Sequence, residues 1–164
     1  GWRFLPCLFN ELVDFVEIEL AWSNIIWNDE ARKKFKAPWY ASGWFRWRVW
    51  RSPAAGLDSL NWQMSLKDED GNPTPQAEAA KEILELYRWW SWGRKQRPDI
   101  HDSTGWTEYC RRKDDGYLGF LSEDKDPEKV RELLKKVHDL EEKYEKEDEE
   151  QLIRLIKIRN SLWT

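Results

Sequence analysis

Tryptophan accounts for 13 of the 164 residues, and a chain this rich in indole must either enclose these large side chains or leave them on its surface. An enclosed aromatic side chain buries roughly 150–250 Å², so tryptophan alone can dominate the core of one domain. Each buried indole N–H also needs a hydrogen-bond acceptor, and tryptophan is rarely enclosed completely. We therefore expect several indoles to reach the surface.

Arginine accompanies tryptophan in the densest aromatic stretch, residues 44–51, which reads Trp-Phe-Arg-Trp-Arg-Val-Trp-Arg. The net charge is −4, yet segments 31–53 and 88–113 are both net basic, and they contain the two densest groups of aromatic residues. Exposed tryptophan beside arginine is typical of interface hot spots and of surfaces that stack nucleic-acid bases. The alternative is that arginine stacks on tryptophan inside the same domain as ordinary cation–π support.

Length and cysteine content indicate one domain in a reducing compartment. A chain of this size buries enough surface to fold without disulfides or metals. Cys7 and Cys110 are the only cysteines, and we expect them to be packed side chains. No apolar run is long enough to span a membrane, and acidic residues interrupt the N-terminal stretch. These features predict a cytoplasmic protein that does not enter the membrane.

Hydrophobic periodicity predicts a mainly α fold. Apolar residues recur at helical spacing over residues 5–20, with Glu17 on the opposite, solvent-facing side. A short helix is expected from a cap at Asn28 to Ala37. Residues 38–53 fit neither a helical nor a strand period, so their secondary structure stays open.

The middle of the chain predicts three further helices. A modest helix is expected over residues 54–66, and a strong one begins with Thr74 as cap and Pro75 in the first turn, and ends near Gly93. A short helix that contains Trp106 follows, with Ser103 or Thr104 as its cap. No internal repeat is present in this sequence.

The C-terminal segment predicts a long charged helix, with Asp126 as cap and Pro127 in the first turn. An acidic run at residues 145–151 separates two apolar ends, so the segment forms either one helix with a solvated middle or a helical hairpin. We expect a single-domain helical array, in which a Trp-rich core at residues 1–125 and the amphipathic segment at residues 126–164 belong to the same domain.

No catalytic or metal-binding constellation accompanies the indoles. The acidic turn near Gly71 lacks two essential oxygen ligands of a calcium loop, and the cysteines and histidines lack the spacing of a zinc site. The chain contains no phosphate loop, nucleophile elbow or metalloprotease motif. Cys110 has basic neighbours that favour a thiolate, and His101 could act as a base, but a packed thiol beneath a basic helix end is the favoured interpretation of Cys110. We therefore expect no enzyme activity, cofactor or metal.

Several strings in the chain resemble uncharacterised small Trp-rich proteins that are encoded by tailed bacteriophages. The resemblance runs from about Trp27 to the C-terminus and rests on the following segments: the strings around Trp27 and Pro38-Trp39, then Trp50-Arg51-Ser52-Pro53, Gly71-Asn72-Pro73-Thr74-Pro75-Gln76-Ala77, Leu86-Tyr87-Arg88-Trp89-Trp90, Gly105-Trp106-Thr107-Glu108-Tyr109-Cys110 and Ile158-Arg159-Asn160-Ser161-Leu162-Trp163-Thr164. No activity is assigned to these phage proteins, so the resemblance implies no catalytic residues for this chain. It implies a viral product that acts in the infected bacterium or in the virion.

Together these patterns predict a non-enzymatic protein-interaction or assembly module that engages a protein partner or a second copy of itself. The expected partner-binding residues are Trp44, Trp47, Arg48 and Trp50, because aromatic and arginine residues are enriched at interface centres. The alternative is single-stranded nucleic-acid binding, in which bases stack on the indoles and phosphates are followed by arginines. The arginines expected to do so are Arg46, Arg51, Arg88 and Arg94.

Overall fold

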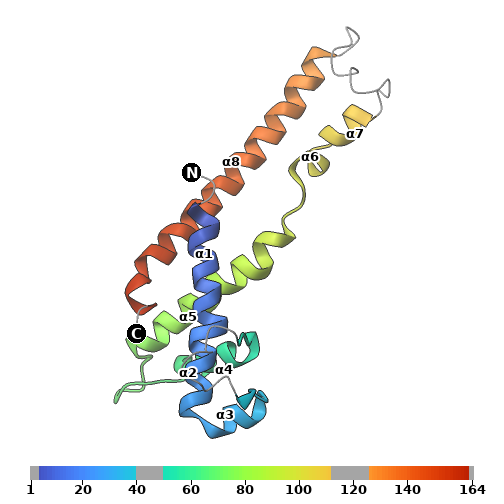
Figure 1. The fold of residues 1–164 in the computed structure, drawn as a ribbon. Coiled ribbons are helices and arrows are strands. Elements are labelled where there is room, and N and C mark those ends of the chain that lie inside the picture. The colour runs from blue at the N-terminus through green and yellow to red at the C-terminus, as the bar shows by residue number, and fades with distance from the viewer. Residues whose placement is uncertain (1–3, 40–49, 112–125, 163–164) are drawn as a thin grey trace. The chain divides into compact units, whose positions relative to one another are not determined.

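The computed structural model describes residues 4–39, 50–111 and 126–162, and these residues are predominantly helical (Figure 1). They contain no β-strand, and their only strand-like pairing is an isolated bridge between Lys67 and Pro73. The predicted mainly α fold is therefore confirmed. Over the same ranges no helix is both long and apolar enough to cross a membrane.

Backbone contacts group the chain into two compact units. The first unit comprises Gly1–Lys95 and Leu152–Thr164, and the second comprises Gln96–Gln151. The boundary expected between residues 125 and 126 lies inside the second unit. Each unit is described separately below.

The N-terminal helix of the first unit contains a π-helical turn. Helix α1 (Phe4–Asp14) passes directly into the π-helical segment η1 (Phe15–Leu20) and then into α2 (Ala21–Trp27). The residues at both junctions keep right-handed helical angles, so the rod is continuous. The wider turn changes the local hydrogen-bond pattern, and the carbonyl of Glu17 accepts a 2.8 Å hydrogen bond from the backbone N–H of Ser52.

Two further helices both contact α2 (Figure 1). Helix α3 (Asp29–Lys34) begins at the predicted cap, where the Asn28 side chain accepts hydrogen bonds from two backbone N–H groups. It ends three residues before the expected Ala37. Helix α4 (Pro53–Met64) begins with Ser52 as its cap, and it packs closely against η1 at Gly56, where an added Cβ would lie 2.0 Å from the carbonyl oxygen of Val16.

Helix α5 (Pro75–Arg88) follows the predicted start, with the Thr74 hydroxyl accepting a hydrogen bond from the N–H of Ala77. A second π-helical segment, η3 (Trp89–Gly93), continues it. The core of this unit forms where α1, η1, α4 and α5 meet the end of the C-terminal helix. Its buried members are Phe9, Leu12, Phe15, Val16, Leu60, Ala80, Ile83, Leu84, Leu86, Tyr87 and Leu155.

The C-terminal segment forms one continuous helix, α8 (Pro127–Lys157), and not a helical hairpin. Its last turns belong to the first unit. There the Arg154 guanidinium donates to both carboxylate oxygens of Glu82 at 2.6 and 2.8 Å and to Glu85 at 2.6 Å. These charge-assisted bonds attach the end of α8 to α5.

In the second unit, α6 (Ile100–Ser103) and α7 (Trp106–Arg111) lie beside the earlier part of α8 (Figure 1). The predicted capping role of Ser103 or Thr104 is wrong. Both residues instead lie at the end of α6, and their hydroxyls donate hydrogen bonds to the carbonyl of Ile100 in the same helix.

The acidic run of α8 is only partly solvated. Arg97, whose side chain is 14% exposed, pairs with Glu147 at 3.1 Å and Asp148 at 2.8 Å. Its guanidinium also lies 4.8 Å from the centre of the Tyr144 ring. One side of this acidic segment therefore contacts protein.

Candidate interaction surface

The structure describes only one of the four residues that the sequence predicts to bind a partner. Trp44, Trp47 and Arg48 lie outside the described residues, as does Arg46. Trp50 is described and is partly exposed.

Arg51 is partly exposed, but its guanidinium is paired within the protein. Its guanidinium donates to Asp14 and, at 2.8 Å, to Glu17. The hydrogen bond to Glu17 is the main cause that raises the pKa of Arg51. The predicted solvent-facing position of Glu17 is wrong, since its side chain is only 12% exposed and also accepts a 2.7 Å hydrogen bond from the Tyr87 hydroxyl.

The two remaining predicted arginines differ in their surroundings. Arg88 is exposed on α5. Arg94 lies 5.2 Å from the centre of the Trp90 ring, and the indole N–H of Trp90 donates to Asn10 at 3.2 Å. The intramolecular cation–π support that the sequence left open is therefore present at Arg94.

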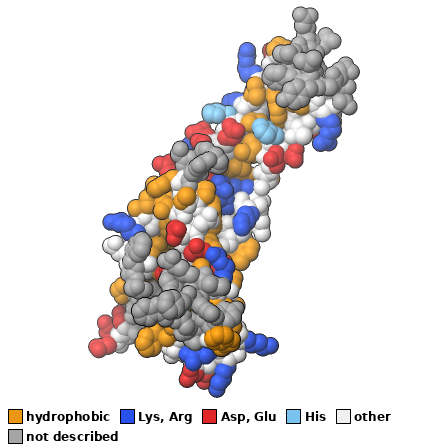
Figure 2. Space-filling view, in the orientation of Figure 1, with side chains coloured by type: hydrophobic (Ala, Val, Ile, Leu, Met, Phe, Trp, Pro, Cys, Tyr) orange, Lys and Arg blue, Asp and Glu red, His pale blue; other side chains and the backbone are white. Residues whose placement is uncertain are grey.

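None of the described tryptophans is buried. Trp89 and Trp90 cover Phe9 with ring centres 5.1 and 5.0 Å away, but both remain partly accessible. Others are largely open to solvent, and hydrophobic side chains interrupt the charged surface on the face drawn in Figure 2. The exposed fractions are 85% for Trp27, 83% for Trp39, 62% for Trp62 and 48% for Trp92. The expectation that several indoles reach the surface is confirmed.

Three exposed tryptophans lie on or just after helices that are attached to one another. Trp27 ends α2, Trp39 follows α3, and Trp62 belongs to α4. Asp58 of α4 accepts hydrogen bonds from Asn24 of α2 and from Lys34 of α3, at 3.2 and 2.5 Å. The bond from Lys34 is the main cause that lowers the pKa of Asp58.

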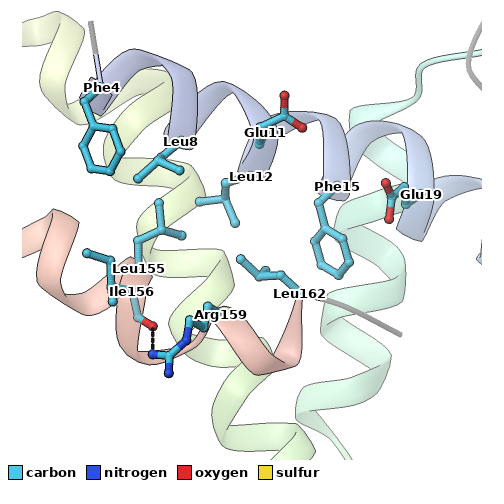
Figure 3. Close-up of a pocket in the computed structure, with 10 residues that line it drawn as sticks. All are labelled: Phe4, Leu8, Glu11, Leu12, Phe15, Glu19, Leu155, Ile156, Arg159 and Leu162. Carbon is cyan, nitrogen blue, oxygen red and sulfur yellow. Dashed lines mark hydrogen bonds between the residues drawn. The ribbon is translucent and has the colours of Figure 1, made fainter. Parts of the chain in front are cut away.

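The first unit also contains an apolar groove of about 540 Å³ between the N-terminal helix and the end of the chain (Figure 3). One wall is formed by α1 and η1, and the other by the last turn of α8 and the residues after it. Apolar side chains point from both walls toward the space between them. They are Phe4, Leu8, Leu12, Phe15, Leu155, Ile156 and Leu162.

The groove is open to solvent and has charged rims. Phe4 is 56% and Ile156 43% exposed, although both are large and apolar. Glu11 and Glu19 line the wall formed by α1 and η1, whereas Arg159 lines the opposite wall and donates a 3.1 Å hydrogen bond to the carbonyl of Ile156 (Figure 3). The groove therefore combines an apolar floor with opposite charges at its two sides.

Sequence reasoning missed this groove because it predicted one apolar stripe on the N-terminal helix. The structure uses two faces: Phe9 and Val16 enter the core, whereas Phe4 and Leu8 line the groove. The signal was present in the width of the apolar face, which exceeds what one packing partner can cover.

The described residues contain no cluster of His, Cys, Asp and Glu side chains that could hold a metal ion. Cys7 and Cys110 are both exposed, so their predicted packing is wrong. No protein-family model matches the chain, and no curated protein or solved structure matches it. Fold and site define a helical protein with exposed indoles and an open apolar groove.

Proposed function

We propose that this protein is a non-enzymatic interaction module that binds a protein partner, or a second copy of itself, through its exposed aromatic surface. The observation that supports this proposal is that Trp27, Trp39 and Trp62 each expose more than half of their surface. Removing exposed apolar surface from water is favourable, so a partner that covered these indoles would gain binding free energy. Tryptophan is also among the residues most enriched in interface hot spots.

Single-stranded nucleic-acid binding is the second candidate, and it has less support. It needs arginines that are available to phosphates, whereas Arg51 is paired with two carboxylates and Arg94 covers an indole of its own chain. Among the three predicted arginines that the structure describes, Arg88 is exposed and has neither of these contacts, and one arginine gives only a small share of the usual phosphate contacts.

The resemblance to Trp-rich phage proteins supports a place of action in the cytoplasm of an infected bacterium or in the virion. In either place, an assembly role would require the module to recognise another protein. This origin is part of the proposal, and no activity follows from it.

The proposal is tested by replacing Trp27, Trp39 and Trp62 with alanine together. Wild type and variant would be compared by light scattering and by crosslinking followed by mass spectrometry in infected cells. We expect the variant to lose a self-association or a specific crosslinked partner. Leu134→Ala is the control, since Leu134 is 48% exposed but belongs to the second unit. Circular dichroism would verify that both variants remain helical.

Two outcomes contradict the proposal. A wild-type protein that stays monomeric and forms no specific crosslink is not an interaction module. A triple variant that keeps every partner shows that these indoles are not the binding surface. Tryptophan quenching by a single-stranded oligonucleotide that weakens steeply with salt would favour the second candidate.

A further inference from the structure

We propose that the groove between α1, η1 and the C-terminal residues is a docking site for an amphipathic helix of a partner protein, with basic residues along one flank of that helix. This inference rests on the proposed interaction function, and it names a different surface and the chemistry of the partner. The groove brings together seven apolar side chains on two walls that lie far apart in the sequence.

The backbone chemistry of the walls favours a helical occupant. Both walls are helical, so most of their backbone N–H and C=O groups are already bonded within the chain. An extended peptide would need a free strand edge to satisfy its own backbone. A helix satisfies its backbone internally and contributes only side chains, as in other helix-in-groove complexes.

The dimensions also fit a short helix. The α1 residues at the groove run from Phe4 to Leu12, which is about 12 Å at 1.5 Å per residue, and Phe15 continues the same wall. Three turns of an occupant helix would cover this length. Its apolar residues would recur at three- and four-residue spacing.

A symmetric dimer of this chain would fill the groove poorly. In a symmetric dimer that used this surface on both copies, one concave surface would face another and the space between them would stay unfilled. Empty space of that kind forfeits packing contacts on both sides. The groove therefore requires a convex partner.

The charges at the rims determine the polarity of the occupant. Glu11 and Glu19 lie on one side, and Arg159 lies on the other. Lysine or arginine on the flank that faces Glu11 would be attracted, whereas the same residues beside Arg159 would be repelled. A partner helix with one basic flank and one neutral or acidic flank matches both sides.

The test uses two synthetic helical peptides with the same leucine stripe. One carries lysines on one flank, and the other carries glutamates at the same positions. Binding to the full chain would be measured by fluorescence anisotropy of labelled peptide at low and physiological salt. We expect the basic peptide to bind at least tenfold more tightly than the acidic peptide.

Two variants of α8 provide a matched comparison. Ile156→Glu places a charge in the groove, and Ile153→Glu places the same charge at a neighbouring residue that is 45% exposed but does not line it. We expect the first to weaken the basic peptide at least tenfold and the second to leave it unchanged. Both changes add the same negative charge, so a purely non-specific attraction would strengthen binding of the basic peptide equally in the two variants.

Glu11→Lys tests the rim, and we expect it to reduce the preference for the basic peptide. Equal weakening by Ile156→Glu and Ile153→Glu, or no binding of either peptide, would overturn the docking site. Unchanged preference in Glu11→Lys would overturn the assigned charge pattern. Either failure leaves the proposed function testable through Trp27, Trp39 and Trp62, which do not line the groove.

Discussion

The hydroxyl of Tyr87 donates a 2.7 Å hydrogen bond to Oε1 of Glu17, which connects α5 to the π-helical turn η1. Tyr87 is 1% exposed, and burial followed by this hydrogen bond raises its pKa above the ordinary value of 10.0. The folded state therefore holds the phenol in its neutral form. This contribution to stability is complete below pH 10 and is lost as the pH rises above it.

We expect the free energy of unfolding to fall above pH 10 by a larger amount in the wild type than in Tyr87→Phe. At neutral pH the variant should be less stable by about 1.5–3 kcal/mol, the usual range for a hydrogen bond to a charged group. Urea unfolding between pH 7 and pH 11 measures both effects. Parallel curves for the two proteins would show that Tyr87 does not contribute to the alkaline loss.

Gly56→Ala should destabilise the first unit. The new Cβ would lie 2.0 Å from the carbonyl oxygen of Val16, so α4 and η1 would have to separate. Overpacking of this kind costs about 1–3 kcal/mol. The control is Gly93→Ala, whose Cβ would meet nothing closer than a Trp89 ring carbon at 3.7 Å, and whose stability should not fall. Equal denaturation midpoints for both variants would contradict the close approach at Gly56.

Arg154→Met should lower stability at pH 7 and flatten the loss of stability in acid. The hydrogen bond from Arg154 is the main cause that lowers the pKa of Glu82 below its ordinary value of 4.5. Stability from this lowered pKa is complete above pH 4.5 and is lost as the pH falls below it. Because the groups are partly exposed, we expect a cost of only about 1–2 kcal/mol at neutral pH.

Lys146→Met is the control for Arg154→Met, since it breaks only an exposed pair with Glu142 one turn away on α8. Its unfolding midpoint should match that of the wild type, and its acid profile should change less than that of Arg154→Met, because solvent screens the exposed interaction between Lys146 and Glu142. An Arg154→Met protein with a wild-type acid profile would show that the contact with Glu82 does not contribute to folding.

Acrylamide quenching should distinguish the tryptophans by their accessibility. Trp27→Phe and Trp39→Phe each remove an indole that is more than 80% exposed, so the remaining emission should be harder to quench. Trp89→Phe removes a less accessible indole that packs on Phe9, so the remaining emission should be easier to quench. Stern–Volmer constants measure this difference, and the opposite order would contradict the exposure described above.

Local signals predicted the starts of helices well. Asn28, Thr74 and Pro127 lie at or beside the expected helix starts, because capping depends on residues a few positions apart. The ends were less accurate: α3 stops at Lys34 rather than at Ala37.

Features that depend on distant residues could not be predicted from local patterns. The groove joins Leu8 to Leu155, and the position of Glu17 depends on both Tyr87 and Arg51. Such contacts follow from how helices pack, which periodicity does not specify. The π-helical turns could not be predicted either, because five or six residues are too few to show a distinct hydrophobic period.

The π-helical turn at Phe15–Leu20 accommodates one more residue than an α-helix would hold over the same rotation. Deleting one residue within this segment would therefore restore ordinary α-helical winding and leave residues 4–14 in nearly the same orientation relative to α2. Inserting one residue after Leu8 would instead turn the residues before it by about 100°, since 3.6 residues complete a turn, and Phe4 and Leu8 would leave the groove. The wide turn thus allows this helix to lose a residue without disturbing either the groove wall or the hydrophobic interior.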